Sequence, residues 1–557
     1  MSLEKRPWCS HYPQEVPQTI DYPDHVLTDW LLQAANEYPE HTAIQFLGRS
    51  IPYQELLSHV YRLAHLWQKL GVKQGDRIGI MLPNTPQAVI GYFATLLLGA
   101  IVVQINPLYQ EKELAHQLSD SGTEILLCLD LIYPRVKKVL PKTHLKTLLI
   151  TSLKDYLPPL KSWLYPFMQK QPKIDYDEST LLLAKELEQV RDTPIQSPLP
   201  SNDSLAILQY TGGTTGLSKG AMLTHRNLVV NVRQIHAWCY RFQRGDIRIL
   251  GVMPFFHVYG MTTVMNFAIY LAGTMILVPK FEPLQLLRAI HRYHPNVFPG
   301  APTIYASLLR HPQVNKYDLS SIQACISGSA PLDRELQDQF EALTGGILTE
   351  GYGLTEASPV THINLIWDRK RSHTIGLPLP DTDCRVVDPE TGTELMPGQQ
   401  GELHVKGPQV MKGYWNQPGE TKSALRDGWL ATGDIVKMDE SGYFEVVDRK
   451  KDMIITNGYN VFPREVEEVL LQHEAVEEAA VIGVPDLKRG ELIRAVVVPV
   501  QGKAIAEKDL EHFCRQHLAA YKIPRQIEFR SQLPKSAIGK VLRRVMKEEA
   551  LRTIEPK

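Results

Sequence analysis

The sequence predicts an α/β protein with a large N-terminal domain of stacked α/β sheets, a small β-barrel-like subdomain and a small α+β C-terminal domain. Strand and helix patterns alternate through residues 77–129, which is typical of parallel sheets. Short strands separated by turns follow Gly376. The last stretch, of about 110 residues, alternates strands and helices and has the size of a separate domain. We place the N-terminal domain at 1–448, its β-rich part at about 376–448 and the C-terminal domain at 449–557.

The bulk composition argues against several classes of protein. The 557 residues carry a net charge of −1, which gives no electrostatic sign of nucleic-acid binding. The six cysteines include no CxxC pair, so we interpret them as reduced packing residues of a cytoplasmic protein. The first residues lack the apolar stretch of a secretory signal, and no apolar run is long enough to span a bilayer.

The N-terminal elements follow from hydrophobic spacing. Apolar residues at helical intervals predict a long helix over Tyr53–Leu70 that ends at Gly71. Continuous apolar runs between helical patterns predict the strands of a parallel sheet. The expected strands are Arg77–Leu82, Ala100–Ile105 and Glu124–Leu129, and the expected helices are Leu27–Tyr38, Thr85–Leu98 and Gln110–Ser119.

The segment Thr151–Gln171 mixes aromatic and aliphatic residues with lysines. One interpretation is a basic and aromatic patch that touches a membrane surface or a partner. The other is a helical hairpin that packs on the core and is interrupted at Pro158-Pro159. The sequence leaves both open. Residues 172–203 are acidic and then rich in proline and serine, which predicts a linker.

The glycine-rich stretch Tyr210–Gly220 predicts a loop that binds a polyphosphate. It follows the apolar run Leu205–Leu208, an expected strand, and precedes a helix expected at 227–239. Glycines let backbone N–H groups face a ligand, while hydroxyls and the charge of Lys219 add donors. The spacing is not that of the Walker motif, since Lys219 does not directly follow a glycine. A flexible surface loop is the alternative interpretation.

Small-residue turns after other expected strands are further candidate sites. In Pro254–Gly260, His257 lies between aromatic residues at a strand–helix junction, where it could orient a substrate. A lone histidine in such a place is more often structural. The turns Phe298–Pro302 and Ser327–Pro331 each open a helix where a ligand can approach the backbone.

The heptad Glu350–Glu356 combines glycines with polar side chains. Its glycines leave Tyr352 room to lie against a planar ring. Thr355 can donate to a phosphate, and Glu356 can hold a Mg2+ ion that arrives with a nucleotide. A glycine-bearing turn without a ligand is the alternative.

Three charged positions lie in the C-terminal third of the chain. Asp434 follows a tight turn, and its carboxylate can accept hydrogen bonds from both hydroxyls of a ribose. The run Asp448–Asp452 lies between two expected strands and has a solvated turn as its alternative interpretation. Lys540 follows Gly539 in a loop that can come close to a ligand.

These stretches together resemble the adenylate-forming superfamily of acyl- and aryl-CoA synthetases, luciferase and adenylation domains. Within it, they are most similar to bacterial long-chain fatty acid–CoA ligases. The resemblance covers about residues 20–550, and the motifs occur in the order and spacing of the family. They are Tyr210–Gly220, Pro254–Gly260, Gly351–Glu356, Thr432–Asp434, Asp448–Asn460 and Pro534–Lys540.

The resemblance implies two half-reactions that use ATP, coenzyme A and Mg2+. A fatty-acid carboxylate first attacks the α-phosphorus of ATP, which gives acyl-AMP and pyrophosphate. The thiol of coenzyme A then attacks the acyl carbonyl, and AMP leaves. Between the steps the small C-terminal domain is expected to be mobile and to turn about a hinge at Lys451.

The resemblance also implies roles for individual residues. The catalytic residues would be His257, Thr355, Glu356 and Lys540, with Lys540 bridging the carboxylate and the α-phosphate. The Mg2+ ligands would be Glu356 and Thr215. The nucleotide-binding residues would be Thr211, Gly212, Gly213, Thr214, Thr215, Gly216, Lys219, Gly328, Ser329, Ala330, Gly351, Tyr352, Gly353, Thr355, Asp434 and Arg449. The residues near the acyl chain and coenzyme A would be Trp238, His257, Val258, Tyr259, Gly260 and Gly458, with Trp238 as a gate of the acyl tunnel.

Several alternatives stay open at this point. The acid could be a medium-chain or aryl acid, or the enzyme could stop at acyl-AMP. An amino-acid substrate is disfavoured, because Phe255–Gly260 has no aspartate to meet an ammonium group. A binding protein without catalysis would be expected to lose charged positions that are present here. A homodimer, and peripheral contact with the inner face of the membrane by a cytoplasmic enzyme, are also left open.

Overall fold

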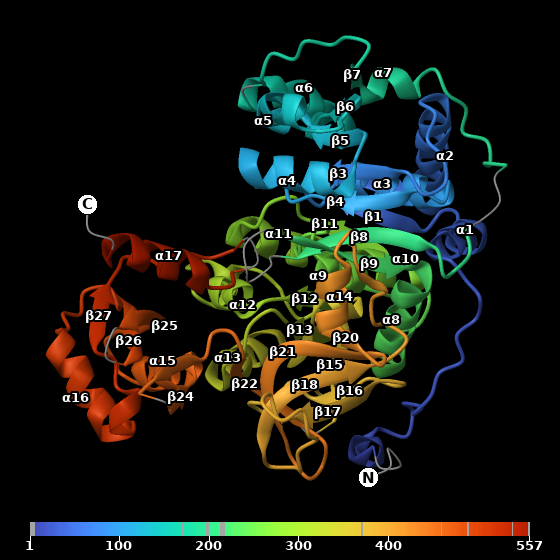
Figure 1. Ribbon diagram of the computed structural model, residues 1–557. Helices are drawn as coiled ribbons and strands as arrows, with labels where there is room; N and C mark the ends of the chain where they lie inside the picture. The colour runs from blue at the N-terminus through green and yellow to red at the C-terminus, as the bar shows by residue number, and fades with distance from the viewer. Residues whose placement is uncertain are drawn as a thin grey trace. The chain divides into compact units, whose positions relative to one another are not determined.

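The structure, a computed structural model, describes residues 6–169, 171–196, 200–211, 218–368, 371–457, 459–486, 489–536 and 539–554. The chain divides into two compact units. The first unit consists of Met1–Asp383 and Val405–Leu430, and the second consists of Cys384–His404 and Ala431–Lys557. The predicted mixed α/β architecture, with a large N-terminal part and a smaller C-terminal part, is confirmed (Figure 1).

The first unit contains a sheet of nine strands whose central strands are parallel. These central strands are buried, as expected for parallel strands with helices on both faces. In sheet order the strands are β16 (Leu377–Pro378), β15 (Val360–Ile363), β14 (Ile347–Gly353), β13 (Ala324–Ser327), β12 (Val297–Gly300), β10 (Arg248–Gly251), β11 (Thr274–Leu277), β1 (Thr42–Phe46) and β2 (Arg49–Pro52).

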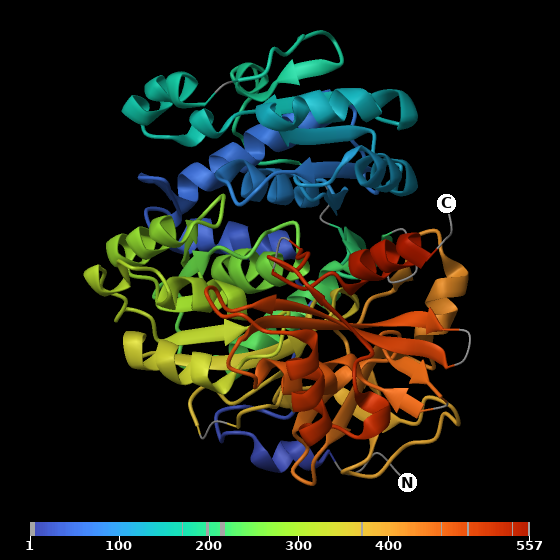
Figure 2. The ribbon, with the colours of Figure 1, turned by 90° about the vertical axis from the view of Figure 1, so that its left-hand side faces the viewer.

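The first unit also contains a sheet of eight strands, and Figure 2 shows the two sheets as separate layers. The strands predicted at 77–82, 100–105 and 124–129 pair in parallel at its centre. In sheet order the strands are β19 (Gly413–Tyr414), β9 (Lys219–Thr224), β8 (Leu205–Thr211), β4 (Ile101–Gln104), β3 (Arg77–Met81), β5 (Ile125–Leu129), β6 (Thr147–Thr151) and β7 (Thr180–Leu182).

Helices pack against these two sheets. The predicted helix from Tyr53 buries Leu56, Leu63 and Trp67 on one face and is followed by Gly71 at φ +82°. The α-helices of the first unit are α1 (Leu27–Glu37), α2 (Tyr53–Lys69), α3 (Pro86–Leu97), α4 (Glu111–Ser121), α5 (Tyr133–Val139), α6 (Pro159–Met168), α7 (Leu183–Leu187), α8 (His225–Trp238), α9 (Val258–Gly260), α10 (Phe267–Tyr270), α11 (Pro283–Tyr293), α12 (Pro302–Leu309), α13 (Arg334–Thr344) and α14 (Pro418–Ala424).

Two local expectations differ from the structure. The glycine-rich stretch was expected to connect a strand directly to a helix, but β9 intervenes and pairs antiparallel with β8. The helix expected after Gly260 contains a π-helical turn, η5 (Met261–Asn266), before α10 begins. Both departures depend on pairing and packing with distant segments, which local apolar spacing does not report.

The β-rich region forms a five-stranded sheet, and the division between the units falls inside its strands β17, β18 and β21. The unit that holds the C-terminal residues is therefore larger than the domain expected at 449–557, because β21 pairs with β22 up to Arg449. Movement of residues 449–557 as one body stays a prediction. The strands are β17 (Asp383–Val387), β18 (Gln400–Lys406), β20 (Leu425–Arg426), β21 (Trp429–Met438) and β22 (Phe444–Arg449).

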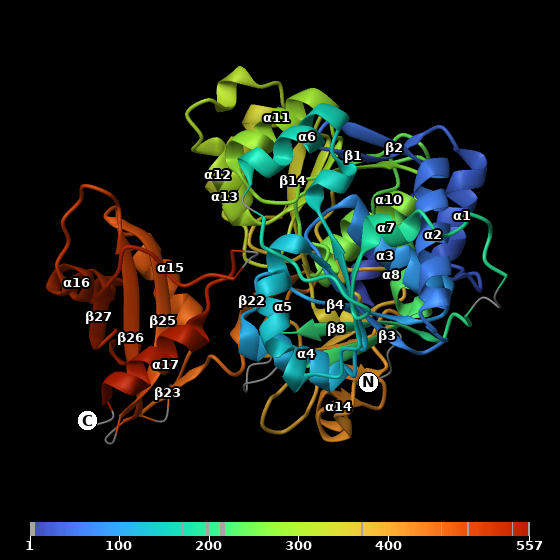
Figure 3. The ribbon, with the colours of Figure 1, turned by 90° about the horizontal axis from the view of Figure 1, so that it is seen from above.

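A second five-stranded sheet in the second unit has helices on both faces (Figure 3). Successive residues of β25 point to opposite faces. Val481 packs with α15 and α16, whereas Ala480 and Ile482 pack with Met546 of α17. The elements are β23 (Ile454–Thr456), β24 (Tyr459–Val461), α15 (Pro463–Leu471), β25 (Val476–Asp486), β26 (Gly490–Pro499), α16 (Glu507–His517), β27 (Gln526–Phe529) and α17 (Arg543–Ile554).

Short 3-10 turns complete the described elements: η1 (Pro7–His11), η2 (Asp130–Ile132), η3 (Leu140–Lys142), η4 (Leu153–Tyr156), η6 (Val314–Lys316), η7 (Thr355–Ala357) and η8 (Ala520–Lys522). Within the described ranges, no helix combines the length and the apolar character that crossing a membrane requires.

Candidate active site

The glycine-rich stretch connects the two strands of a hairpin. Thr211 at the end of β8 lies opposite Lys219 at the start of β9, and Tyr210 lies opposite Gly220. A side chain at position 220 would crowd the Tyr210 ring, because an added Cβ would lie 3.1 Å from it. The predicted phosphate-binding residues Gly212, Gly213, Thr214, Thr215 and Gly216 lie outside the described residues.

Lys219 is held in place by two side chains from the segment after residue 410. Its ammonium group forms an ion pair with Glu420 of α14 and lies 5.2 Å from the centroid of the Tyr414 ring. Tyr414 belongs to β19, which pairs antiparallel with β9. The register of these two strands therefore brings Tyr414 beside Lys219.

Glu356 is hydrogen-bonded to the same tyrosine. The Tyr414 hydroxyl donates a hydrogen bond of 2.7 Å to Glu356 Oε1. Burial, together with the negative charge of Glu356, raises the pKa of Tyr414, so the hydroxyl stays protonated and can donate. Tyr414 thus contacts both Lys219 and Glu356, the predicted ligands of phosphate and of Mg2+.

The half-buried Glu356 suits a Mg2+ ion that binds with a nucleotide. Mg2+ is commonly held by one or two carboxylates together with substrate phosphate oxygens. Among the residues that the structure describes, no group of three or more His, Cys, Asp or Glu side chains is arranged to hold a metal by itself. Glu356 and Thr355 lie together in η7, directly after β14.

Close packing excludes a side chain at Gly353 and leaves little room for one at Gly351. A Cβ at Gly353 would lie 2.1 Å from the Pro359 carbonyl oxygen, and one at Gly351 would lie 3.1 Å from Ile326. The Tyr352 ring makes an edge contact with the ring of His362, with the centroids 5.7 Å apart. His362 is buried, which lowers its pKa to about 3 and keeps it neutral.

The turn after β13 lies against Tyr259. The Tyr259 hydroxyl donates to the Ile326 carbonyl at 2.7 Å, and a Cβ at Gly328 would lie 3.2 Å from the Tyr259 ring. Ser329 has a left-handed backbone with φ +73°, and Ala330 next to it is half-buried. The structure thus brings Tyr259, expected near the acyl chain, beside the turn expected near adenine.

The turn Pro254–Gly260 is shaped by its own contacts. His257 Nδ1 accepts a hydrogen bond from the Tyr259 N–H at 3.2 Å and so caps α9. A Cβ at Gly260 would lie 2.4 Å from the carbonyl oxygens of Met253 and Pro254, so packing alone accounts for this glycine. Val258 is buried.

Trp238 ends α8 and is buried. Its indole N–H donates to the Asn364 carbonyl at 3.1 Å, and its ring packs edge-on against Tyr12 at 5.2 Å. Any gating movement of this side chain would have to break both contacts. Its role as a gate stays a prediction.

In the second unit, Asp434 and Arg449 are cross-strand neighbours on β21 and β22. The two side chains form an ion pair with 3.3 Å between Arg449 Nε and Asp434 Oδ1. A buried carboxylate, Glu402, supports the turn beside them by accepting from the Gly433 N–H at 3.1 Å and from Lys450 at 2.9 Å. Although burial opposes ionisation, His404 and Lys450 lower the pKa of Glu402 to about 2.

Lys540 lies close enough to Asp434, Arg449 and Lys451 for their charges to act on it. Burial, followed by the positive charge of Arg449, lowers the pKa of Lys540 from 10.5 to about 7. The same causes lower the pKa of Lys451 to about 8. Near Lys540, Gly539 has φ +78° and the Ser536 N–H donates to the Lys540 carbonyl at 2.8 Å. Gly458 lies outside the described residues.

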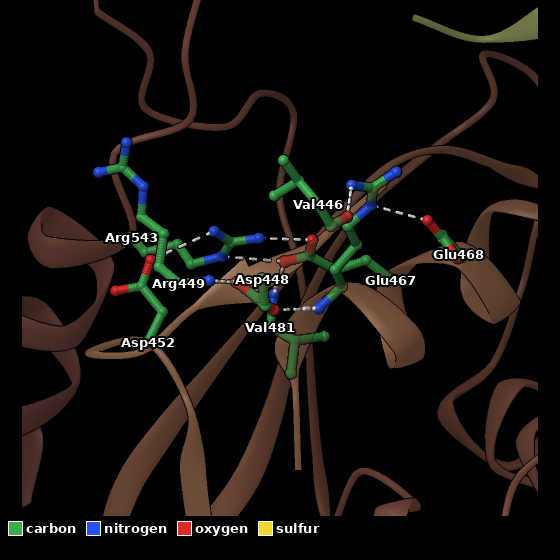
Figure 4. A network of polar contacts seen from close by, with 9 residues as sticks. Val446, Asp448, Arg449, Asp452, Glu467, Glu468, Val481 and Arg543 are labelled. Atoms are coloured by element: carbon green, nitrogen blue, oxygen red, sulfur yellow. Dashed lines mark hydrogen bonds and ion pairs between the residues drawn. The ribbon is translucent and has the colours of Figure 1, made fainter. Parts of the chain in front are cut away.

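A buried ion-pair network lies at the start of α17 (Figure 4). Arg543, three residues after Lys540, donates to Glu467 Oε2 at 2.6 Å and contacts Asp452 at 3.4 Å. Glu467 also accepts from the Val481 N–H at 2.7 Å. The network therefore connects the start of α17 with α15, β25 and the turn after Lys451. Burial raises the pKa of Glu467 in spite of Arg543.

Sequence reasoning missed Tyr414, Glu402, Glu420, Glu467 and Arg543. None of these residues stands in a motif with a recognisable ligand geometry, and each acts on a residue that is distant in the sequence. The sequence therefore offered no signal for their partners.

Comparison with protein families decides the classification. Residues 31–415 match the model of the AMP-binding enzyme family, and residues 465–540 match the model of the AMP-binding enzyme C-terminal domain. The chain belongs to the AMP-binding enzyme family. The predicted membership of the adenylate-forming superfamily is confirmed.

Relatives of this AMP-binding enzyme match it along nearly the whole chain. A long-chain-fatty-acid–CoA ligase of Bacillus subtilis (strain 168) is 48% identical over 550 residues, which cover 98% of each chain. A long-chain-fatty-acid–CoA ligase of Salmonella typhimurium is 37% identical, covering 99% of this chain and 100% of the other. The crystal structure of ATP-bound MatB from Rhodopseudomonas palustris matches with a TM-score of 0.84 and 31% identity, covering 96% of this chain and all of MatB.

Replacing Arg543 with methionine is expected to destabilise this enzyme by about 3 kcal/mol, because Glu467 would be left buried without its counter-charge. Urea unfolding, followed at the transition of the second unit, measures the loss. The double variant Arg543→Met with Glu467→Leu should recover most of it. Arg515→Met, which removes an exposed ion pair with Glu511 at 2.6 Å, is the matched control and should cost less than about 1 kcal/mol. Equal losses for the two single variants would contradict the buried network.

Proposed function

We propose that this AMP-binding enzyme activates long-chain fatty acids as acyl-AMP and transfers them to coenzyme A. The observation that carries the proposal is the 48% identity, over 98% of both chains, to a long-chain-fatty-acid–CoA ligase. The products would be acyl-CoA, AMP and pyrophosphate. A medium-chain or aryl acid is the alternative substrate, and turnover across a series of fatty and aryl acids distinguishes them.

In the first half-reaction an oxygen of the fatty-acid carboxylate forms a bond to the α-phosphorus, and the bond from that phosphorus to pyrophosphate breaks. This step concentrates negative charge, so oriented cations and donors stabilise it. We assign Lys540 to the carboxylate and the α-phosphate, Thr355 to the α-phosphate, and Lys219 with the Thr211–Gly216 loop to the terminal phosphates. Bound Mg2+, held by Glu356 and Thr215, would neutralise phosphate charge.

The ribose and the adenine of the nucleotide are assigned to different residues. Asp434 can accept the ribose hydroxyls, and the ion pair with Arg449 orients its carboxylate. Tyr352, between Gly351 and Gly353, is assigned to the face of adenine, with Gly328–Ala330 along the edge of the ring. These assignments rest on the family resemblance and on the contacts around each side chain.

In the second half-reaction the thiol of coenzyme A attacks the acyl carbonyl, loses its proton, and AMP leaves. We assign His257, Val258, Tyr259 and Gly260 to the acyl and thiol side of the site, and Gly458 to coenzyme A. Turning about Lys451 would exchange Lys540 for the Gly458 region between the two steps. Each buried methylene of the acyl chain contributes about 0.8 kcal/mol, so the length of the tunnel can select the acid.

A single-turnover assay, run with and without coenzyme A, tests the order of the two half-reactions. Running it on the variant Lys540→Ala as well tests the role of that lysine. We expect this variant to release pyrophosphate about 100- to 1,000-fold more slowly, because charge at the reacting phosphorus loses its counter-charge. Thioester formation from supplied acyl-AMP should be largely retained. Equal loss of both steps would contradict the assignment of Lys540 to the first. Acyl-AMP without any thioester would identify an acyl-AMP ligase instead.

The pH dependence of pyrophosphate release tests the state of Lys540. Since its pKa is lowered to about 7, the free enzyme loses the ammonium charge as the pH rises above that value. We therefore expect kcat/KM for ATP, measured without coenzyme A, to fall about tenfold per pH unit above the pKa. Lys540→Arg keeps its charge at all these pH values and should abolish the fall, whatever its absolute rate. A parallel fall in both enzymes would show that another group titrates.

We also propose that α6 makes the peripheral contact with the inner face of the membrane. Leu160, Trp163 and Phe167 of this helix are 70%, 67% and 79% exposed, which is unusual for such large apolar side chains. Residues 156–174 contain three lysines and no acidic residue, which suits an anionic lipid surface. Fatty acids dissolve in that surface, so binding there would place the enzyme beside its substrate.

Sedimentation with phosphatidylglycerol vesicles tests this surface. The double variant Trp163→Ala, Phe167→Ala should bind about tenfold more weakly or worse, because two interfacial side chains are lost. Leu108→Ala is the matched control, since Leu108 is 63% exposed in the same unit and lies outside α6. Equal vesicle binding by both variants would contradict the proposal. A homodimer stays a prediction. If the α6 double variant fails to form a dimer that the unchanged enzyme and the Leu108→Ala control both form, the α6 surface serves self-association.

A further inference from the structure

Glu420 occupies a position from which it competes for the predicted phosphate-binding lysine. Its carboxylate Oε2 forms an ion pair with the Lys219 ammonium, and the Tyr414 ring lies along the same lysine. The side chain of Lys219 is only 18% exposed, whereas that of Glu420 is 49% exposed. The lysine is therefore fixed in the protein, and the carboxylate can withdraw into water.

Strand pairing and hydrogen bonds of neighbouring residues position the backbone at Glu420. β19 pairs with β9, and the Trp415 N–H donates to the Gly220 carbonyl at 2.8 Å. Thr421, next to Glu420, accepts from the Tyr414 N–H at 2.9 Å and so attaches α14 to β19. The backbone therefore brings this carboxylate to the lysine that begins β9.

An ion pair of this exposure is weak and readily exchanged. A partly exposed lysine–carboxylate pair contributes little, while charge-assisted contacts with a phosphate are stronger. A nucleotide phosphate can therefore displace the carboxylate from Lys219. When the phosphate leaves, the carboxylate can return and satisfy a lysine that would otherwise be mostly buried without a counter-charge.

We propose that Glu420 is a positioning residue that competes with the terminal phosphates of the nucleotide for Lys219 and promotes the release of pyrophosphate. The inference rests on the proposed adenylating function. The competition is not required by the reaction itself. It means that the Glu420 carboxylate weakens the binding of both ATP and pyrophosphate. AMP lacks the terminal phosphates, so its binding should not respond to Glu420.

The variant Glu420→Gln tests this competition, because it removes the charge and keeps the size of the side chain. By isothermal titration without an acid substrate, the Kd values of ATP and of pyrophosphate should each fall about fivefold. The Kd of AMP should stay unchanged. Product inhibition by pyrophosphate in the adenylation assay should become stronger by the same factor.

Two controls separate competition from a general change of charge. In a Lys219→Met background, Glu420→Gln should no longer tighten ATP binding, since the contested cation is gone. Glu124→Gln makes the same charge change at an exposed pair with Lys146 (2.8 Å) before β5 and should leave ATP binding unaltered.

Unchanged ATP affinity in Glu420→Gln would overturn the inference. So would an equal tightening of AMP, or a gain that persists in the Lys219→Met background. Because nucleotide binding is measured without fatty acid or coenzyme A, these results do not depend on the choice of acid. An enzyme that forms no acyl-CoA from any acid, yet binds ATP more tightly after Glu420→Gln, would contradict the proposed function and support the competition.

Discussion

The concentration of positive charge around Asp434 is the constraint on which the second unit depends. Lys540, Lys451 and Arg449 act on one another's charges, and burial already disfavours the charged forms of the two lysines. Burial is the largest cause of the fall in the pKa of Lys540 to about 7. The charge of Arg449 adds to this fall, and the carboxylates of Asp434 and Asp452 oppose it. Under the proposed function, a phosphate beside Lys540 would favour the charged form of the lysine.

The lysine of the first unit, Lys219, has a different environment. Lys219 is paired with Glu420 and lies along Tyr414, whose hydroxyl reaches Glu356. Positive charge is therefore neutralised here before a ligand arrives. Under the proposed function, a phosphate would replace an existing partner at Lys219, whereas at Lys540 it would join cations that have Asp434 and Asp452 nearby.

The fold was predictable where it depends on local periodicity. The parallel strands β3, β4 and β5 and the helix α2 lie within a residue or two of the expected bounds, because apolar spacing reports burial directly. The strand β9 and the π-helical turn at Met261 were missed. β9 is defined by pairing with β8 and β19, and a π-turn has no distinct apolar pattern.

The sequence by itself determined the class of the protein, because glycine-rich and charged motifs in a fixed order identify the adenylate-forming superfamily without coordinates. It also named Glu356, Asp434, Arg449 and Lys540 as members of a site. Only the tertiary structure decided what each of them touches. Arg449 reaches Asp434 by strand register, Glu356 reaches Tyr414 across 58 residues, and Arg543 reaches Glu467 across 76 residues. Pairing over such separations is a property of strand register and packing, which no local pattern encodes.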